Sequence, residues 1–154
     1  TASRPAVPTS GRSSTRAGGS LTVVDASIVV RLLQNRRDDD ELRERFGRER
    51  RIHAPALIDA EVTSAIRGLL MTSKPAIQIT AARAEQMLDD FARLPLVRYP
   101  MQPFQRRALA LRENFTAYDA FSLALADSLS MPLLTDDREF GKAPEQGVVI
   151  ETWS

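Results

Sequence analysis

Residues 21–25 read Leu-Thr-Val-Val-Asp, and residues 131–137 read Met-Pro-Leu-Leu-Thr-Asp-Asp. Each stretch is a short apolar run that ends in an acid, and such runs are typical of strands buried on both faces of a parallel sheet. Around them, short apolar segments alternate with longer segments of helical periodicity. Strands that alternate with helices form parallel βαβ units with right-handed crossovers. We therefore predict an α/β fold, a three-layer α/β/α sandwich around a mainly parallel central sheet.

The pattern places five short strands, at about 21–24, 52–54, 96–99, 133–135 and 148–151. Helices are expected at about 27–33, 38–50, 55–71, 75–91, 103–113 and 116–129. Pro55 and Pro75 are each expected in the first turn of a helix, a position that suits proline. The charged segment 38–50 contains Glu–Arg pairs four residues apart and is expected to be a solvated helix.

The amino-acid composition limits the classes of protein and of reaction that are possible. A chain of 154 residues with 43% hydrophobic and 27% charged residues suits one globular domain. No apolar run approaches the roughly 20 residues that cross a bilayer, so we expect no membrane partner and a cytoplasmic protein. The absence of cysteine excludes thiolate chemistry, and the single histidine, His53, makes a Ser-His-Asp mechanism improbable. His53 and Trp153 are both expected to be packing residues.

Residues 1–20 differ from the rest of the chain. They are rich in Ser, Thr, Pro and Gly and contain three arginines but no acid. Such a segment cannot bury enough apolar surface to fold, so we expect a disordered basic tail at 1–20 and a folded domain at 21–154. The tail has no hydrophobic region of the length found in signal peptides.

Four acids, Asp25, Glu61, Asp119 and Asp137, lie where strands are expected to end or helices to begin. Ligands of open α/β sheets bind outside the carboxyl ends of the strands, so these side chains are expected to meet at one edge. Close carboxylates repel one another, and a divalent cation relieves that repulsion. An oxygen-rich site of this kind suits Mg²⁺ or Mn²⁺, which activates water for phosphodiester hydrolysis.

Each acid also has a purely structural interpretation. Asp25 is a suitable N-cap for the helix that follows it. Asp119 lies three residues after Thr116, which is the spacing of a capping box. Glu61 is equally well explained as an ordinary surface residue, although the small side chains that follow it on its helical face favour a cleft. Spacing does not decide between Asp136 and Asp137.

Together these segments resemble the PIN-domain ribonucleases, and in particular the VapC-type toxins of bacterial toxin–antitoxin pairs. The resemblance rests on four segments that match in order and context: VVDASIVVRLL, the helix with Glu61-Val62, TAYDAFSLALA and PLLTDDREF. It spans about 21–151 and implies a PIN-like fold. It assigns the catalytic acids to Asp25, Glu61, Asp119 and Asp137, the last because the family pattern Thr-x-Asp falls on residues 135–137.

The resemblance implies further properties. Asp25, Asp119 and Asp137 are expected to hold Mg²⁺, and Ser27 and Thr135 to support the site. The expected activity is cleavage of structured RNA, tRNA or rRNA, which inhibits translation. The expected partners are a VapB-type antitoxin and a second copy of the chain. From composition alone, Arg106, Arg107 and Arg112 are candidates for RNA-backbone contacts, because few acids lie near them in the sequence.

Two other functions remain open at this point. A haloacid-dehalogenase-like phosphatase also places an aspartate after its first strand, but it requires a second aspartate where Ser27 stands, and Lys142 is the only plausible lysine. A nuclease-inactive PIN module would bind RNA or protein without cutting. Cleavage of RNA with and without EDTA distinguishes these functions.

Overall fold

The computed structural model describes residues 21–142 and 147–153, so the basic tail expected at 1–20 lies outside the described residues. All five strands are parallel, in the order β3-β2-β1-β4-β5. The strands are β1 Val23–Val24, β2 Ile52–Pro55, β3 Leu96–Tyr99, β4 Leu133–Thr135 and β5 Ile150–Thr152. The expected α/β class and parallel sheet are confirmed.

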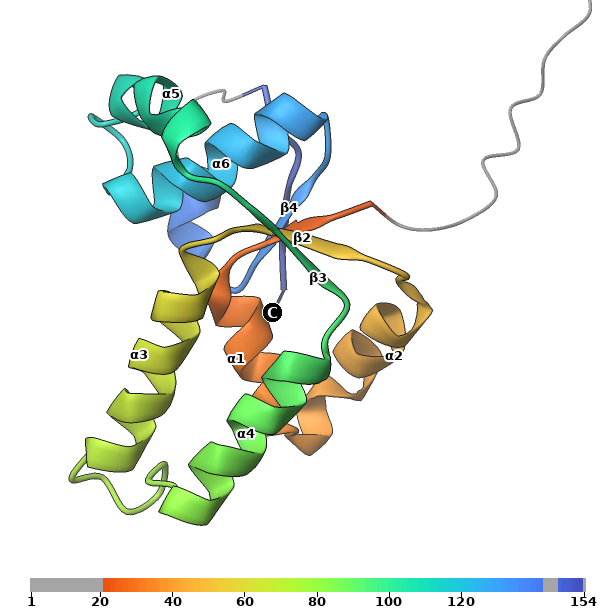
Figure 1. Ribbon diagram of the computed structural model, residues 1–154, viewed down its shortest axis with the longest axis vertical. Helices are drawn as coiled ribbons and strands as arrows, with labels where there is room; N and C mark the ends of the chain where they lie inside the picture. Colours follow the sequence, from red (N-terminus) through yellow and green to blue (C-terminus); the bar gives the residue numbers. More distant parts are fainter. Residues whose placement is uncertain (1–20, 143–146, 154) are drawn as a thin grey trace, which may run out of the picture.

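Helices cover both faces of the sheet (Figure 1). On one face lie α1 Ala26–Gln34, η1 Arg37–Asp39, α2 Asp40–Arg48, α3 Ile58–Met71 and α4 Ala81–Arg93. On the other lie η2 Gln102–Phe104, α5 Gln105–Ala110, α6 Ala117–Leu129 and η3 Arg138–Lys142. Among the described residues, no helix is both long and apolar enough to cross a membrane.

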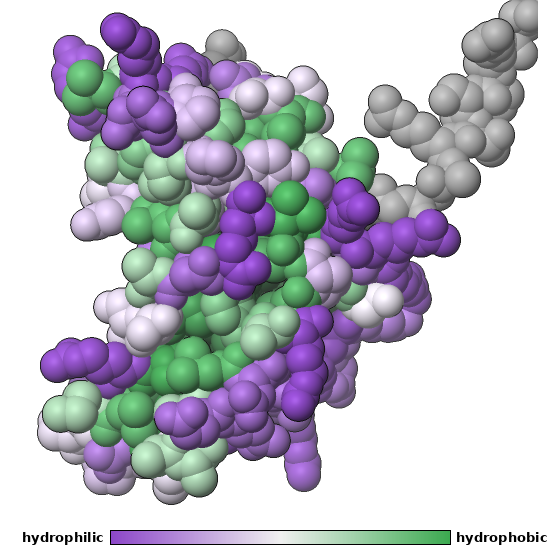
Figure 2. Space-filling model, viewed as in Figure 1, coloured by the Kyte–Doolittle hydropathy of each residue, from purple (hydrophilic) through white to green (hydrophobic). Residues whose placement is uncertain are grey.

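The two-residue period of the strands divides the hydrophobic core into two halves. Val23 and Leu133 face α5 and α6, whereas Val24 and Leu134 face α1, α3 and α4. All four side chains are at most 1% exposed. Hydrophobic surface also gathers between α3 and α4 on the face seen in Figure 2. The continuous apolar runs of the sequence are therefore strands buried from both sides.

Both prolines expected in first helical turns lie elsewhere. Pro55 is the last residue of β2, and α3 begins at Ile58. In a strand, the amide positions of residues 53 and 55 face the same side, here toward β1. The amide of His53 donates to the Thr22 carbonyl, so the Val24 carbonyl would face the nitrogen of residue 55, where proline has no hydrogen to donate. The pairing of β1 with β2 is therefore limited to Val23 and His53.

The helix expected from Pro75 begins instead at Ala81. Thr80 is its N-cap, and the Thr80 hydroxyl accepts a hydrogen bond from the Arg83 amide at 3.1 Å. Residues 75–77 form a turn. A threonine that satisfies a free amide defined the helix start better than a proline that merely tolerates it.

The charged segment 38–50 is less solvated than expected. Leu42 and Phe46 pack into the core, and two of the acids are buried, Asp39 at 0% and Glu49 at 5% exposure. Asp39 pairs with Arg31 of α1. Glu49 accepts a 3.4 Å hydrogen bond from the Thr22 hydroxyl and lies 3.8 Å from Arg45 Nε. The i,i+4 pattern correctly predicted a helix, but it did not predict that Arg31 and Thr22, from other segments, would contact its buried acids.

Helix α6 carries little charge and buries the side chains of its middle turns, Ala120 and Ser122–Ala126. Leu125 is 0% exposed in the half of the core between α6 and the sheet. We expect Leu125→Ala to lower the free energy of unfolding by about 3 kcal/mol, since it loses buried area and leaves a cavity. Leu109→Ala, at a 67% exposed position of α5, should change it by less than about 0.5 kcal/mol. Urea titrations of both variants measure the difference, and equal losses would contradict the packing described.

Candidate active site

Asp25 lies at the point where the order of the sheet reverses. The chain continues from β1 to β2 on one side, while β4 pairs with β1 on the other. The crevice at such a switch point is where open α/β sheets bind ligands. The Asp25 amide donates to the Leu134 carbonyl at 3.3 Å, which holds the ends of β1 and β4 together.

Both carboxylate oxygens of Asp25 are hydrogen-bonded. Oδ1 accepts from the Ser27 hydroxyl at 2.5 Å, the Ser27 amide at 3.1 Å and the Ile28 amide at 3.4 Å. Oδ2 accepts from the Thr135 hydroxyl at 2.5 Å. The first oxygen therefore caps α1, while the second retains a lone pair for a further ligand. The capping and functional interpretations of Asp25 are compatible.

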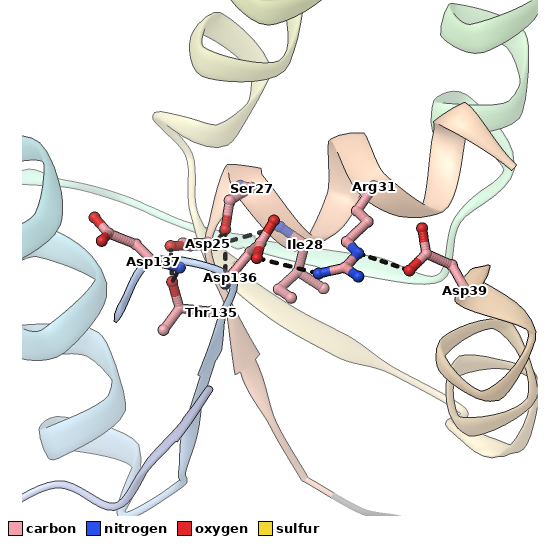
Figure 3. Close-up of polar contacts among 8 residues, drawn as sticks. All are labelled: Asp25, Ser27, Ile28, Arg31, Asp39, Thr135, Asp136 and Asp137. Carbon is pink, nitrogen blue, oxygen red and sulfur yellow. Dashed lines mark hydrogen bonds and ion pairs between the residues drawn. The ribbon is translucent and has the colours of Figure 1, made fainter. Parts of the chain in front are cut away.

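The two hydroxyls also hold the loop that follows β4 (Figure 3). The Asp136 amide donates to Ser27 Oγ at 3.0 Å, and the Asp137 amide donates to Thr135 Oγ1 at 3.0 Å. Each hydroxyl thus accepts from this loop and donates to Asp25. Ser27 and Thr135 fix the position of Asp137 relative to Asp25, although the two acids are 112 residues apart in sequence.

Asp136 and Asp137 have different surroundings. Asp136 is exposed and its Oδ1 lies 3.1 Å from Arg31 Nη1, whose Nε is 2.6 Å from the buried Asp39. Asp137 is half-buried, and its Oδ1 accepts from the Glu139 amide at 2.8 Å. Figure 3 shows Arg31 between Asp39 and Asp136, away from Asp137. Arg31 neutralises Asp136 and so leaves Asp137 as the acid on the side of Asp25.

The other two acids, Glu61 and Asp119, lie in the first turns of helices. Asp119 lies in the first turn of α6, where its amide donates to the Thr116 hydroxyl at 3.3 Å. This bond is one half of the capping box that the sequence suggested. Glu61 lies in the first turn of α3, and its amide donates to the Leu57 carbonyl. The small side chains of Ser64 and Ala65 line the same hollow as Glu61.

The four acids influence one another electrostatically. Burial raises the pKa of Asp25, and its hydrogen bonds from Ser27 and Thr135 oppose the rise. Burial, with smaller contributions from the negative charges of Asp25 and Asp119, raises the pKa of Glu61 to about 7. Burial also raises the pKa of Asp119, and the charge of Asp137 adds to it. The structure thus brings together the four acids that the sequence singled out.

The donor set fits a hard divalent cation. Among residues 21–142 and 147–153, no three acidic or histidine side chains converge closely enough to hold an ion by themselves. Mg²⁺ retains several waters and is commonly bound by one or two carboxylates. Oxygen-only ligands and a free lone pair on Asp25 therefore suit Mg²⁺ with water completing its shell.

The three arginines proposed for RNA contacts lie on or after α5. All are exposed, but Arg107 lies 3.5 Å from Asp127, and Arg112 donates to the Leu109 carbonyl. Asp127 is eight residues along α6 from Asp119, or about 12 Å at the helical rise. Arg107 is thus directed away from the acids. Sequence reasoning overlooked Arg31, whose contact with Asp136 spans 105 residues.

His53 is buried, as expected of a packing residue, and Trp153 is partly buried against the core. His53 Nδ1 lies 2.8 Å from the Tyr99 hydroxyl. Burial, and to a lesser extent the charge of Arg51, lowers the pKa of His53. The histidine lies within the strand and contributes nothing to the acidic cluster.

A parallel sheet with carboxylates gathered at its switch point is the arrangement of a small α/β enzyme whose site lies outside the ends of the strands. The PIN domain family matches residues 22–146. The chain is 35% identical over 117 residues to ribonuclease VapC9 of Mycobacterium tuberculosis, covering 76% of this chain and 86% of that protein. It is 32% identical over 131 residues to ribonuclease VapC12 of the same species, covering 85% and 98%.

Solved structures of other proteins share the fold of this chain. DNA-bound VapBC of Salmonella typhimurium superposes with a TM-score of 0.61 and 22% identity over 87% of this chain and 98% of that one. PAE2754 of Pyrobaculum aerophilum superposes with a TM-score of 0.59 and 20% identity over 86% and 92%. The chain belongs to the PIN-domain family, among relatives named as VapC ribonucleases. The expected PIN-like fold and the family resemblance are confirmed.

The pKa of Glu61 has a consequence for stability. A carboxyl whose folded-state pKa exceeds its unfolded value holds more protons in the folded state, so stability falls as pH rises between the two values. With a chelator present, Glu61→Gln should raise the free energy of unfolding by about 1 kcal/mol at pH 8, since water screens the half-exposed carboxyl. The gain should vanish as pH falls from about 7 toward 4.5.

Urea titrations at pH 5 and pH 8 test this expectation. Glu85→Gln, on the exposed surface of α4, is the matched removal of a charge. A gain that is the same at both pH values, or equal in the two variants, would show that the pKa of Glu61 is not raised in the folded chain.

Arg31 should contribute strongly to stability, because its guanidinium forms an ion pair with the buried Asp39 carboxylate. Arg31→Met should cost about 3 kcal/mol by leaving that charge buried and unpaired. Adding Asp39→Asn should recover at least half of the loss. A double-mutant cycle in urea measures the coupling, and simple additivity of the two losses would contradict the pairing.

Proposed function

We propose that this chain is a Mg²⁺-dependent endoribonuclease and the toxin of a type II toxin–antitoxin system. The observation that carries the proposal is the meeting of Asp25, Glu61, Asp119 and Asp137 at the β1–β4 switch point. The ribonuclease names of relatives that align over most of their length support the same reaction.

In this mechanism Asp25, Asp119 and Asp137 hold Mg²⁺, directly or through water. The ion would neutralise the crowded carboxylates, polarise the scissile phosphate and make a bound water more acidic. Ser27 and Thr135 keep Asp25 oriented through their hydrogen bonds. No imidazole or covalent intermediate is required, and the products are a 5′-phosphate and a 3′-hydroxyl.

Glu61 is the residue that receives the proton of the attacking water. A general base is most effective when its pKa is near the working pH, and burial beside other acids raises the pKa of Glu61 to about 7. Glu61 lies at the start of α3, where the negative charges of Asp25 and Asp119 act on its carboxyl group, and this position suits the role.

The proposed partners follow from the solved relatives. Several of these are VapBC complexes, which supports a VapB-type antitoxin as a partner of this chain. We further propose a homodimer that acts in the cytoplasm on structured RNA, tRNA or rRNA, and so inhibits translation.

The phosphatase alternative is disfavoured by the site itself. Such an enzyme requires an acid where Ser27 stands, and here the Ser27 hydroxyl connects Asp25 to the Asp136 amide. The family match is also to PIN domains. A nuclease-inactive PIN module is tested by the same cleavage experiment as the proposal.

Asp25→Asn should reduce cleavage of total RNA by about 100-fold or more, because Thr135→Val, which removes only the hydrogen bonds of one hydroxyl to Asp25 and the Asp137 amide, should already cost about 10- to 100-fold. EDTA should abolish cleavage, and added Mg²⁺ should restore it. Gel analysis with mapping of 5′-phosphate ends measures both effects. Asp127→Asn, the same chemical change elsewhere on α6, is the control. Full cleavage by Asp25→Asn, or in EDTA, would refute the mechanism.

A further inference from the structure

Two surface hollows meet at Glu61. One is bordered by Leu57, Ala60, Ser64, Ala65 and Tyr118 and has a volume of about 530 Å³; we call it the Tyr118 hollow. The other includes Ser27, Arg31, Gln34, Arg36 and Asp136 and has a volume of about 580 Å³; we call it the Arg36 hollow. Glu61 lines both, so the hollows adjoin each other beside the acidic cluster.

Tyr118 is placed as a stacking surface. It precedes Asp119 in the first turn of α6 and is 62% exposed. The ring pairs found among the described residues do not include it. The opposite wall, on α3, includes the short side chains of Ala60, Ser64 and Ala65, which leave room beside the ring. An exposed aromatic ring beside a nuclease site suits an unpaired base, because every base has a flat face that stacks.

Arg36 supplies uncompensated positive charge at the other end. Arg31 shares its hollow but is paired with Asp39 and Asp136. Arg36 is exposed and takes part in none of the ion pairs of the described residues. A free guanidinium beside a group of carboxylates attracts the phosphate that those carboxylates repel.

From these positions we infer that the two hollows are nucleotide subsites for an unpaired RNA strand, which crosses over Glu61. A base next to the scissile bond stacks on Tyr118, and a backbone phosphate on the other side of that bond contacts Arg36. In duplex RNA the bases stay stacked within the helix, so only an unpaired segment can occupy the Tyr118 hollow. This inference rests on the proposed ribonuclease function and adds to it the two side chains, Tyr118 and Arg36, that position the strand.

Binding without cleavage tests the inference. A fluorescein-labelled, unstructured RNA octamer and the same strand annealed to its complement are titrated with the full chain in EDTA, and anisotropy is recorded. Tyr118→Ala should weaken binding of the single strand about tenfold or more, whereas Tyr118→Phe, which keeps the ring, should stay within about twofold. The duplex should bind the unaltered chain less tightly than the single strand. Leu109→Ala, another exposed apolar side chain, is the matched control.

The phosphate contact is tested through salt dependence. Arg36→Gln should reduce the slope of log K against log salt by about 0.7, the value for one contact with a single strand. Arg93→Gln, at a 76% exposed arginine of α4, should leave the slope unchanged. Equal slopes for the two variants, or equal affinities for Tyr118→Ala and Tyr118→Phe, would overturn the inference. So would a change in molar mass of Tyr118→Ala by light scattering, which would make Tyr118 a contact between copies.

The proposed function and this inference can fail separately. If the chain binds the octamer through Tyr118 but does not cut it with Mg²⁺, the proposed subsites are supported and the proposed nuclease function is wrong. If the chain cuts RNA equally well with and without the Tyr118 ring, the proposed nuclease function is supported and the proposed subsites are wrong. A chain that neither binds nor cuts RNA would overturn both.

Discussion

The organisation of this molecule depends on one buried carboxylate, that of Asp25. A charged group in such a position is costly unless hydrogen bonds replace the water it has lost. Here two hydroxyls and two amides do so, and they belong to α1 and to the end of β4. Satisfying Asp25 therefore also fixes the junction of β1, α1 and β4, and this junction carries the rest of the acidic cluster.

The fold was largely predictable, because apolar runs and helical periodicity are local properties of the sequence. The runs ending at Val24 and Thr135 became neighbouring strands, as their flanking acids suggested. The errors came from interactions that are not local. Pro55 ends β2 beyond the one residue of β2 that pairs with β1, and Asp39 is buried beside Arg31, which reaches it from another helix. Neither fact can be obtained from the composition of a single segment.

The acids of the site were found from the sequence for a related reason. Strand ends and helix starts can be located from pattern, and in a parallel sheet they lie at one edge. The surroundings of those acids could not be found in the same way. Spacing did not separate Asp136 from Asp137, and the structure distinguishes them through Arg31. Among the arginines chosen for a lack of nearby acids in sequence, Arg107 pairs with Asp127 across two helices, because neighbours in space are not set by distance along the chain.

Capping and function proved to be joint rather than competing roles. A helix N-terminus needs an acceptor for its free amides, and it also favours negative charge. Asp25 and the start of α6 use this requirement to hold acids where isolated carboxylates would be driven apart. These hydrogen bonds only partly replace the lost water, so burial raises the pKa values of Asp25, Glu61 and Asp119, and neighbouring negative charges add a smaller rise. A bound divalent cation would offset both costs, so the arrangement that makes these carboxylates costly to the fold is also the one that suits a cation.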